Sequence, residues 1–352
     1  MGKDGYLLNH SLKLRIKGFG ASLALVWLAL ATYHYATYYK NLTSATAQHY
    51  FVIIAVVYSL CALFFYALAS IVKVQNSKPW LTFLAIYRII RGLGSFIRSG
   101  PRDYHQPLVK MSFEEKRALL FNLVKFFFIP LMITYMVANY HELTNNLEAV
   151  KQAGQPLISV SSFNSFWYPF LFSLTLFIDV TFFVFGYLFE AGFLKNKIRS
   201  VEPTALGWIV ALICYAPFNG LLSNYVNWYA NDSPVGSTAN LTFWIRLISL
   251  LFMIVYASAS VALGPKASNL TNRGIVGYGP YRIIRHPAYT CKNIAWWITM
   301  LPVFRLSAVV GMTVWSSIYF MRAITEERHL SADPDYVAYC KKVKYRFIPG
   351  LI

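Results

Sequence analysis

Long, almost uncharged apolar runs recur along this chain of 352 residues, and they limit its fold more than any other feature. A helix that crosses the hydrocarbon core of a bilayer needs about 20 such residues. Because 57% of the residues are apolar and only 13% are charged, the composition disfavours a soluble globular domain. We therefore expect an all-α, polytopic integral membrane protein. The runs predict spans at 19–39, 50–72, 118–140, 166–190, 205–222 and 243–263, then a shorter pair at 293–304 and 306–321.

Lysine and arginine are distributed unevenly between the two sides of these spans. By the positive-inside rule the basic segments face the cytosol, which predicts about eight transmembrane helices with both termini cytosolic. Attraction to anionic lipid headgroups accounts for the net charge of +18, so the expected partner is the bilayer and not nucleic acid. Of the 32 basic residues, 27 lie in the segments 1–18, 73–117, 191–203, 264–292 and 322–352.

The spans divide the chain into two parts. We expect an N-terminal bundle of six spans over 1–263, with an amphipathic helix on the cytosolic leaflet near 79–98, and a C-terminal hairpin with a cytosolic tail over 264–352. Asp179 falls near the middle of the fourth span, where an ionised carboxylate is costly. A functional acid and a structural, paired acid both fit this position. The sequence has no spacing of ligands typical of a metal site.

A basic, glycine-punctuated segment begins the C-terminal part and includes the run GYGPYRIIRHPAY at 277–289. Its glycines and prolines break helix repeatedly, so the chain turns back on itself beside the membrane. Glycine permits close backbone approach and leaves amides free for an anion. The tyrosines, arginines and His286 add ring faces and donors. From these residues alone, a ligand site and an ordinary basic loop both remain open.

A second charged cluster follows the last span, in the run RAITEERHL at 322–330. Arg322 and Glu326 lie four residues apart and therefore share one helix face. If the terminal hairpin is antiparallel, this face lies level with His286, and an acid beside aromatic rings suits a ligand with amino and hydroxyl groups. A simple helical salt bridge from Arg322 to Glu326 is the alternative.

Together these two motifs resemble a known family. Tyr281-x4-His286-Pro-Ala-Tyr289, followed by Arg322-x3-Glu326-Glu327-x2-Leu330, resembles the isoprenylcysteine carboxyl methyltransferase family, whose wider group includes phospholipid methyltransferases. The resemblance covers about 264–350 and implies S-adenosyl-L-methionine as the cofactor, bound on the cytosolic side. It implies cofactor contacts from Gly274, Ile275, Val276, Tyr281, His286, Pro287, Ala288, Tyr289 and Glu326.

The expected activity is methyl transfer to a lipid or lipid-linked acceptor, a carboxylate, phosphate or similar group, at the cytosolic leaflet. Methyl transfer mainly requires alignment of donor and acceptor and exclusion of water. Arg322 would orient an anionic acceptor, and His286 or Glu327 would take a proton from an amine or hydroxyl. The expected location is a bacterial inner membrane or the endoplasmic reticulum, with the active site facing the cytosol.

Two alternatives remain. The tail YCKKVKYRFIPG at 339–350 is similar to that of sterol C14 and C24 reductases, a sister family that uses NADPH in the same kind of pocket. Those enzymes typically carry Asn in the histidine-proline motif, where this chain has Ala288. Just after the motif they carry glycine followed by Asp or Glu, where this chain has Thr290, Cys291 and Lys292. The third possibility is a non-catalytic lipid-binding membrane scaffold, because fold does not imply function.

Overall fold

The computed structural model describes residues 3–103, 110–154, 156, 159–228, 230 and 237–351. The chain forms two compact units, Met1–Pro130 and Leu131–Ile352. Their boundary falls inside one long helix, at a proline that cannot donate a backbone hydrogen bond. The expected cofactor-binding part lies wholly in the second unit.

In the first unit, two long helices pack against each other. The Arg15 guanidinium of the first donates to the carbonyls of Tyr66 and Ala67 at the end of the second, at 2.6 and 3.0 Å. Those carbonyls have no partner within their own helix, so Arg15 satisfies them. The helices of this unit are α1 (Lys3–Tyr35), α2 (Thr37–Leu42), α3 (Ala45–Leu68), α4 (Ile71–Gln75), α5 (Lys78–Asp103) and the first part of α6 (Phe113–Ala153).

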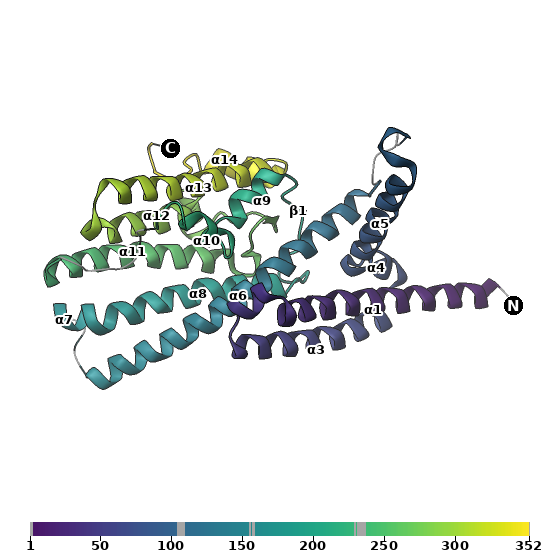
Figure 1. Cartoon of the computed structure of the whole chain (residues 1–352), viewed down its shortest axis with the longest axis horizontal. Coiled ribbons are helices and arrows are strands. Elements are labelled where there is room, and N and C mark those ends of the chain that lie inside the picture. The colour runs from purple at the N-terminus through teal and green to yellow at the C-terminus, as the bar shows by residue number, and fades with distance from the viewer. Residues whose placement is uncertain are drawn as a thin grey trace. The chain divides into compact units, whose positions relative to one another are not determined.

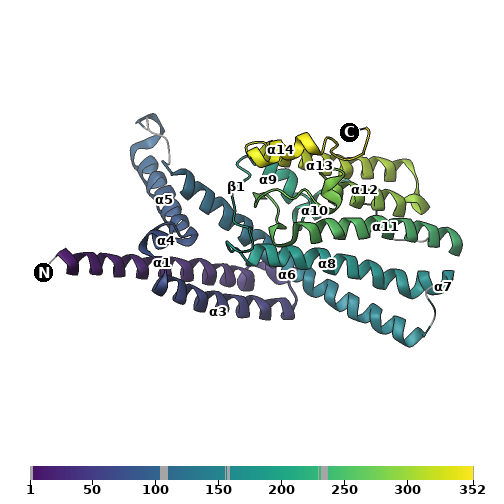
Figure 2. The same ribbon diagram turned by 180° about the vertical axis from the view of Figure 1, so that it is seen from behind.

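The second unit is built around α11, which packs between α8 and α12, while α12 packs in turn on α13 (Figures 1 and 2). Met253 and Tyr256 of α11 meet Cys291 and Ala295 of α12 in one buried cluster. The helices after α6 are α7 (Val160–Ser162), α8 (Tyr168–Leu188), α9 (Ala205–Leu212), α10 (Phe218–Ser223), α11 (Ala239–Leu263), α12 (Pro287–Thr299), α13 (Leu306–Leu330) and α14 (Pro334–Lys342), with a π-helical turn at Phe163–Trp167 and 3₁₀ turns at Gly264–Lys266, Gly279–Arg282 and Leu301–Val303.

Two short contacts fix the segments around the turn after α11. Strands β1 (Ser200–Val201) and β2 (Thr271–Asn272) pair antiparallel. In α8, a Cβ added at Gly186 would lie 2.0 Å from the backbone oxygen of Ala267. Only glycine therefore lets α8 approach this turn so closely.

The expected all-α, polytopic membrane protein is confirmed. Within the described residues, seven helical segments are long and apolar enough to cross a membrane. They are Ser11–Tyr35, Ala45–Leu68, Lys78–Arg98, Phe113–Ala153, Val160–Leu188, Ala239–Lys266 and Leu306–Leu330.

The continuous span expected at 205–222 is not present. Helix α9 ends at Leu212, and α10 begins only after Pro217. With eight residues, α9 is about 12 Å long, far less than the hydrocarbon core of about 30 Å. Similarly, the 13 residues of α12 are too few to cross alone, whereas α13 continues to Leu330. At 78–103 the structure has the expected helix, which by length and composition is also a candidate span.

Candidate functional site

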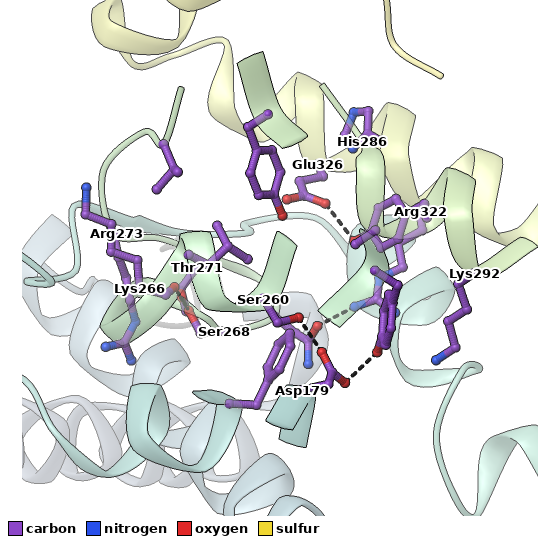
Figure 3. Close-up of a pocket in the computed structure, with 18 of the residues that line it drawn as sticks. Asp179, Ser260, Lys266, Ser268, Thr271, Arg273, His286, Lys292, Arg322 and Glu326 are labelled. Carbon is purple, nitrogen blue, oxygen red and sulfur yellow. Dashed lines mark hydrogen bonds between the residues drawn. The ribbon is translucent and has the colours of Figure 1, made fainter. Parts of the chain in front are cut away.

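The second unit contains a cavity of about 360 Å³, within the usual range for small-molecule sites (Figure 3). It is lined by α8, α11, α12, α13 and the segment between α11 and α12. Pro287 is the one predicted site residue absent from the lining, because its side chain is buried in the first turn of α12, where proline is favoured. The predicted residues that line the cavity are Gly274, Ile275, Val276, Tyr281, His286, Ala288, Tyr289, Arg322 and Glu326.

The structure brings the two charged motifs together. Helix α12 begins at the histidine-proline motif and α13 ends with the second cluster, so an antiparallel pair places both at one end. The Tyr289 hydroxyl donates to Oε2 of Glu326 at 2.8 Å, and Nε2 of His286 lies 3.0 Å from Oε1 of Glu327. The predicted salt bridge between Arg322 and Glu326 is not among the ion pairs of the described residues, since each has another partner.

Glu327 is the hub of a closed network. Its carboxylate is 8% exposed and accepts from Arg285 at 3.2 Å and from Arg346 at 2.8 Å, in addition to its contact with His286. Backbone hydrogen bonds join the same two segments. The amides of Arg285 and His286 donate to the carbonyls of Tyr345 and Arg346 in the tail, both at 2.9 Å. Charge-assisted bonds of this kind are the strong ones. The C-terminal tail is therefore fixed onto the start of α12.

His286 lies inside a stack of rings. Its imidazole is parallel to the ring of Tyr289, with centroids 5.5 Å apart, and Phe347 of the tail stacks on it at the same centroid distance. The side chain is only 6% exposed. With Nε2 engaged by Glu327, the imidazole holds Tyr289 and the tail in place.

Glu326 has the opposite environment to its neighbour Glu327. Successive residues of an α-helix point about 100° apart, so one acid faces the closed network and the other faces the cavity. Glu326 is exposed, lines the cavity and has one carboxylate oxygen bonded to Tyr289 (Figure 3). An ionised carboxylate has about four acceptor positions, so Glu326 retains several for a ligand.

Arg322 is buried in the cavity wall among aromatic rings. Its guanidinium donates to the side-chain oxygen of Asn269 and lies 5.5 Å from the ring centroid of Tyr215, 5.2 Å from that of Tyr289 and 6.0 Å from that of Tyr319. Cation–π contacts stabilise a guanidinium away from water. Arg322 therefore carries its charge into the cavity beside Tyr289.

A second polar cluster lies at the α8 side of the cavity (Figure 3). Asp179 of α8 accepts one hydrogen bond from the Tyr256 hydroxyl, at 2.5 Å, and another from the Ser260 hydroxyl. Both donors belong to α11 and lie one turn apart. The sequence had singled out Asp179, and its depth in a span was the signal, but the two hydroxyl donors were not predicted.

Cations that the motifs did not predict line the cavity near Gly274. A Cβ added at Gly274, where φ is +93°, would lie 3.3 Å from Nζ of Lys266 and from Nη2 of Arg199. Hydrogen bonds with Asp335 and Asp333 raise the pKa of Arg199 above its ordinary value. Burial lowers the pKa of Arg273, which also lines the cavity. This part of the site is positively charged and closely packed around glycine.

The site chemistry agrees with the comparison to known proteins. Residues 241–332 match the model of the isoprenylcysteine carboxyl methyltransferase family. The match confirms the predicted resemblance. It extends from α11 to the end of α13 and includes Tyr256, Ser260, Tyr289, Arg322 and Glu326. Together with the membrane-spanning helices, it supports a membrane methyltransferase. No curated protein and no solved structure matches this chain.

Proposed function

We propose that the protein is an integral membrane methyltransferase that uses S-adenosyl-L-methionine and acts on a lipid or lipid-linked acceptor at the cytosolic leaflet. The observation that carries the proposal is the pair of adjacent acids. The Glu327 carboxylate is fully engaged by Arg285, His286 and Arg346. Glu326 faces the cavity and keeps acceptor positions that no protein group occupies among the described residues. A carboxylate so placed suits the ammonium group of the cofactor.

The remaining lining fits the cofactor as well. Gly274, Ile275 and Val276 line the cavity in an irregular segment. A Cβ at Gly274 would crowd this segment, and the space left by glycine suits close approach of a ligand. Tyr281 and Tyr289 offer ring faces to a planar or cationic group. When bound, the cofactor supplies an electrophilic methyl group on a sulfonium. The residues around it bind the polar end, orient the acceptor and exclude water.

Arg322 and His286 take different roles in this proposal. Arg322 lies beside Tyr289 with its charge in the cavity, where it orients the acceptor. His286 is a positioning residue, because Glu327 occupies its Nε2 and its ring stacks on Tyr289. His286 thus acts on the cofactor through Tyr289, and the tail that it holds covers the same end of the cavity.

The proposed orientation follows from the basic residues. The end of α13 and the tail carry Arg322, Arg328, Lys341, Lys342, Lys344 and Arg346, and such segments face the cytosol. The cofactor enters there from water, and a lipid acceptor enters from the bilayer between helices. An endoplasmic reticulum membrane and a bacterial inner membrane both satisfy this arrangement.

Ligand-induced stabilisation tests the proposal. In a thermal-shift assay on detergent-purified protein, S-adenosylmethionine or S-adenosylhomocysteine at 100 times its dissociation constant stabilises by about 2.7 kcal/mol. We expect this shift with either compound and none with NADPH. A shift with NADPH alone would contradict the proposal.

A reductase is the second candidate, and one observation favours it. Lys266 and Arg273 both line the cavity beside Gly274, and neighbouring cations suit the phosphates of NADPH. In the same assay, a reductase shifts with NADPH and not with S-adenosylhomocysteine. A non-catalytic scaffold shifts with neither.

A further inference from the structure

The Asp179 cluster, defined as Asp179, Tyr256, Ser260 and Lys292, retains hydrogen-bonding capacity that its own members do not use. All four side chains line the cavity. Tyr256 and Ser260 both donate to Asp179, so their hydroxyl oxygens remain acceptors toward the cavity. A carboxylate that accepts two bonds also has positions left. Three side chains therefore present acceptor atoms to whatever enters.

Lys292 of α12 adds the complementary donor. Its Nζ lies 5.2 Å from the ring centroid of Tyr256 and 5.1 Å from that of Trp296. It interacts electrostatically with Asp179. Within the described part of the chain, however, no ion pair joins the two, and the ammonium makes no hydrogen bond. A carboxylate and an ammonium thus both line one cavity without pairing with each other in the described residues.

The presence of both a carboxylate and an ammonium determines which chemical group of an acceptor fits between the walls of the cavity. A hydroxyl donates its proton to a carboxylate and accepts from an ammonium at the same time. A carboxylate or phosphate is attracted by Lys292, but it has no proton to donate to Asp179 and is repelled by it, while a second ammonium is repelled by Lys292. A neutral hydroxyl satisfies both charged side chains, and neither alternative does.

The cluster lies where a lipid acceptor would meet the cofactor. Asp179 is near the middle of the candidate span Val160–Leu188. Lys292 also interacts electrostatically with Arg322, whose guanidinium lies over Tyr289, the partner of Glu326. The same cavity therefore joins the Asp179 cluster to the proposed cofactor-binding acid, through Arg322 and Tyr289.

We propose that the Asp179 cluster is the acceptor subsite and that the acceptor is a lipid with a weakly acidic hydroxyl, a phenol or an enol. This inference rests on the proposed methyltransferase function and narrows its acceptor class. A phenol ionises near pH 10, whereas an aliphatic alcohol is a far weaker acid and a poor match for a carboxylate base. Asp179 is the proton acceptor, and Lys292 stabilises the negative charge that develops on the oxygen.

The transfer balances without a further reactant. The acceptor oxygen forms a bond to the methyl carbon, and the bond from that carbon to sulfur breaks. The electron pair of the broken bond stays on sulfur, which becomes a neutral thioether. The hydroxyl proton moves to the Asp179 carboxylate and then leaves to water. An aryl or enol methyl ether is the product.

Three acceptors that differ only in the head group test the subsite. The probes are 4-dodecylphenol, 4-dodecylbenzylamine, which carries an ammonium group at neutral pH, and 4-dodecylbenzoic acid, each incubated in detergent with purified full-length protein and methyl-labelled S-adenosylmethionine. We expect label in the extracted lipid with the phenol, at a rate at least 10 times that with either other probe. Equal or faster methylation of the benzoate or the benzylamine overturns the inference, and so does the absence of label from the phenol.

Replacement of Asp179 by asparagine tests its role as proton acceptor. General-base catalysis contributes about 10²–10⁴-fold, so we expect Asp179→Asn to lower phenol methylation by at least 100-fold. An acceptor that is already ionised needs no base. With 4-dodecyl-2-nitrophenol, a more acidic phenol assayed at an alkaline pH at which it is fully ionised, we expect a loss of less than 5-fold. Equal losses with both phenols would mean a structural role and would contradict the proposal.

A matched pair of serines controls for effects on folding. Ser260 and Ser249 are both buried on α11, but only Ser260 lines the cavity. We expect Ser260→Ala to slow phenol methylation by about 5–20-fold and Ser249→Ala to leave it unchanged; equal effects would contradict the assignment. Calorimetric measurement of S-adenosylhomocysteine binding distinguishes a failure of the proposed methyltransferase function from a failure of the proposed acceptor subsite. If the wild-type protein does not bind S-adenosylhomocysteine, the proposed function is wrong. If it binds the compound but does not prefer the phenol as acceptor, only the assignment of the acceptor subsite is wrong.

Discussion

The closed network around Glu327 and the open cluster around Asp179 each centre on one buried carboxylate. Glu327 contacts two arginines and a histidine, drawn from the residues just before α12 and from the tail. Asp179 accepts from two hydroxyls of a single helix, and a lysine nearby makes no ion pair with it in the described part of the chain. The first network joins segments distant in sequence. The second leaves hydrogen-bond acceptor positions that face the cavity.

The difference separates structural from ligand-binding acids. A buried charge is costly unless it is paired, so a fully paired acid such as Glu327 holds the fold together and has little left for a ligand. An acid with partial pairing beside a cavity, such as Asp179 or Glu326, is completed by what binds there. Experiments that remove each acid should therefore give different kinds of loss.

Removal of the Glu327 carboxylate should have the largest effect. In Glu327→Ala, the buried His286 and the mostly buried Arg285 lose their partner, and breaking a buried pair costs about 3–5 kcal/mol. We expect unfolding at a lower temperature and faster trypsin cleavage in the tail at Lys344 and Arg346. Glu114→Ala is the control, because this acid is 49% exposed and its ion pair among the described residues is with Arg117, one turn away on the same helix. Similar losses in both variants would contradict a special role for the closed network.

Neutralisation of Glu326 should affect binding and not folding. A hydrogen bond to a charged group contributes about 1.5–3 kcal/mol. We therefore expect Glu326→Gln to weaken S-adenosylhomocysteine binding by roughly 10–100-fold in calorimetry, with an unchanged melting temperature. Glu142→Gln, on an exposed acid outside the cavity lining, should bind as the wild type does. Unchanged affinity in Glu326→Gln would remove Glu326 from the cofactor site.

A methyl group at Gly186 should disturb the Asp179 cluster from a distance. The added Cβ would lie 2.0 Å from the Ala267 oxygen, so α8 must move away from the turn. Overpacking of this kind costs about 1–3 kcal/mol. At Gly220 a Cβ meets nothing within 4 Å, so Gly220→Ala is the matched control. We expect a lower melting temperature and slower lipid methylation only in Gly186→Ala. Equal melting temperatures and equal methylation rates in the two variants would contradict a role of this close contact in positioning the Asp179 cluster.

Asp333 should give the smallest effect, and one that depends on pH. Burial alone would raise the pKa of Asp333, but hydrogen bonds from Asn272 and Arg199 lower it below the ordinary value near 3.9. An acid with a lowered folded pKa adds stability above its unfolded pKa and loses it as pH falls through the folded value.

We therefore expect Asp333→Asn to destabilise by up to about 1 kcal/mol at pH 7. The difference in stability between the variant and the wild type should become smaller below about pH 4. Melting temperatures of both proteins from pH 3 to pH 7 check this. A gap that widens toward low pH would contradict the sign.

The sequence predicted the membrane fold and the meeting of the two motifs, because both depend on local patterns. Apolar runs define spans, and an antiparallel hairpin necessarily brings His286 level with Glu326. The break within 205–222 was not predicted, since the segment is apolar almost throughout and a proline such as Pro217 can kink a transmembrane helix without ending it.

Contacts between segments far apart in sequence could not be predicted. Arg199 reaches Gly274 through the pairing of β1 with β2, and Arg346 reaches Glu327 through the tail. Neither pairing has a periodic signal. Likewise, Asp179 was conspicuous in its span, but Tyr256, Ser260 and Lys292 became its neighbours only through packing of α8, α11 and α12.

The central claim is that the cavity of the second unit binds S-adenosylmethionine next to Glu326. Ultraviolet cross-linking of methyl-labelled S-adenosylmethionine, followed by peptide mapping, tests it directly. The account predicts label in peptides that contain Tyr289 or Glu326, and loss of that label when unlabelled S-adenosylhomocysteine competes. Competed label confined to residues 1–130 would contradict it.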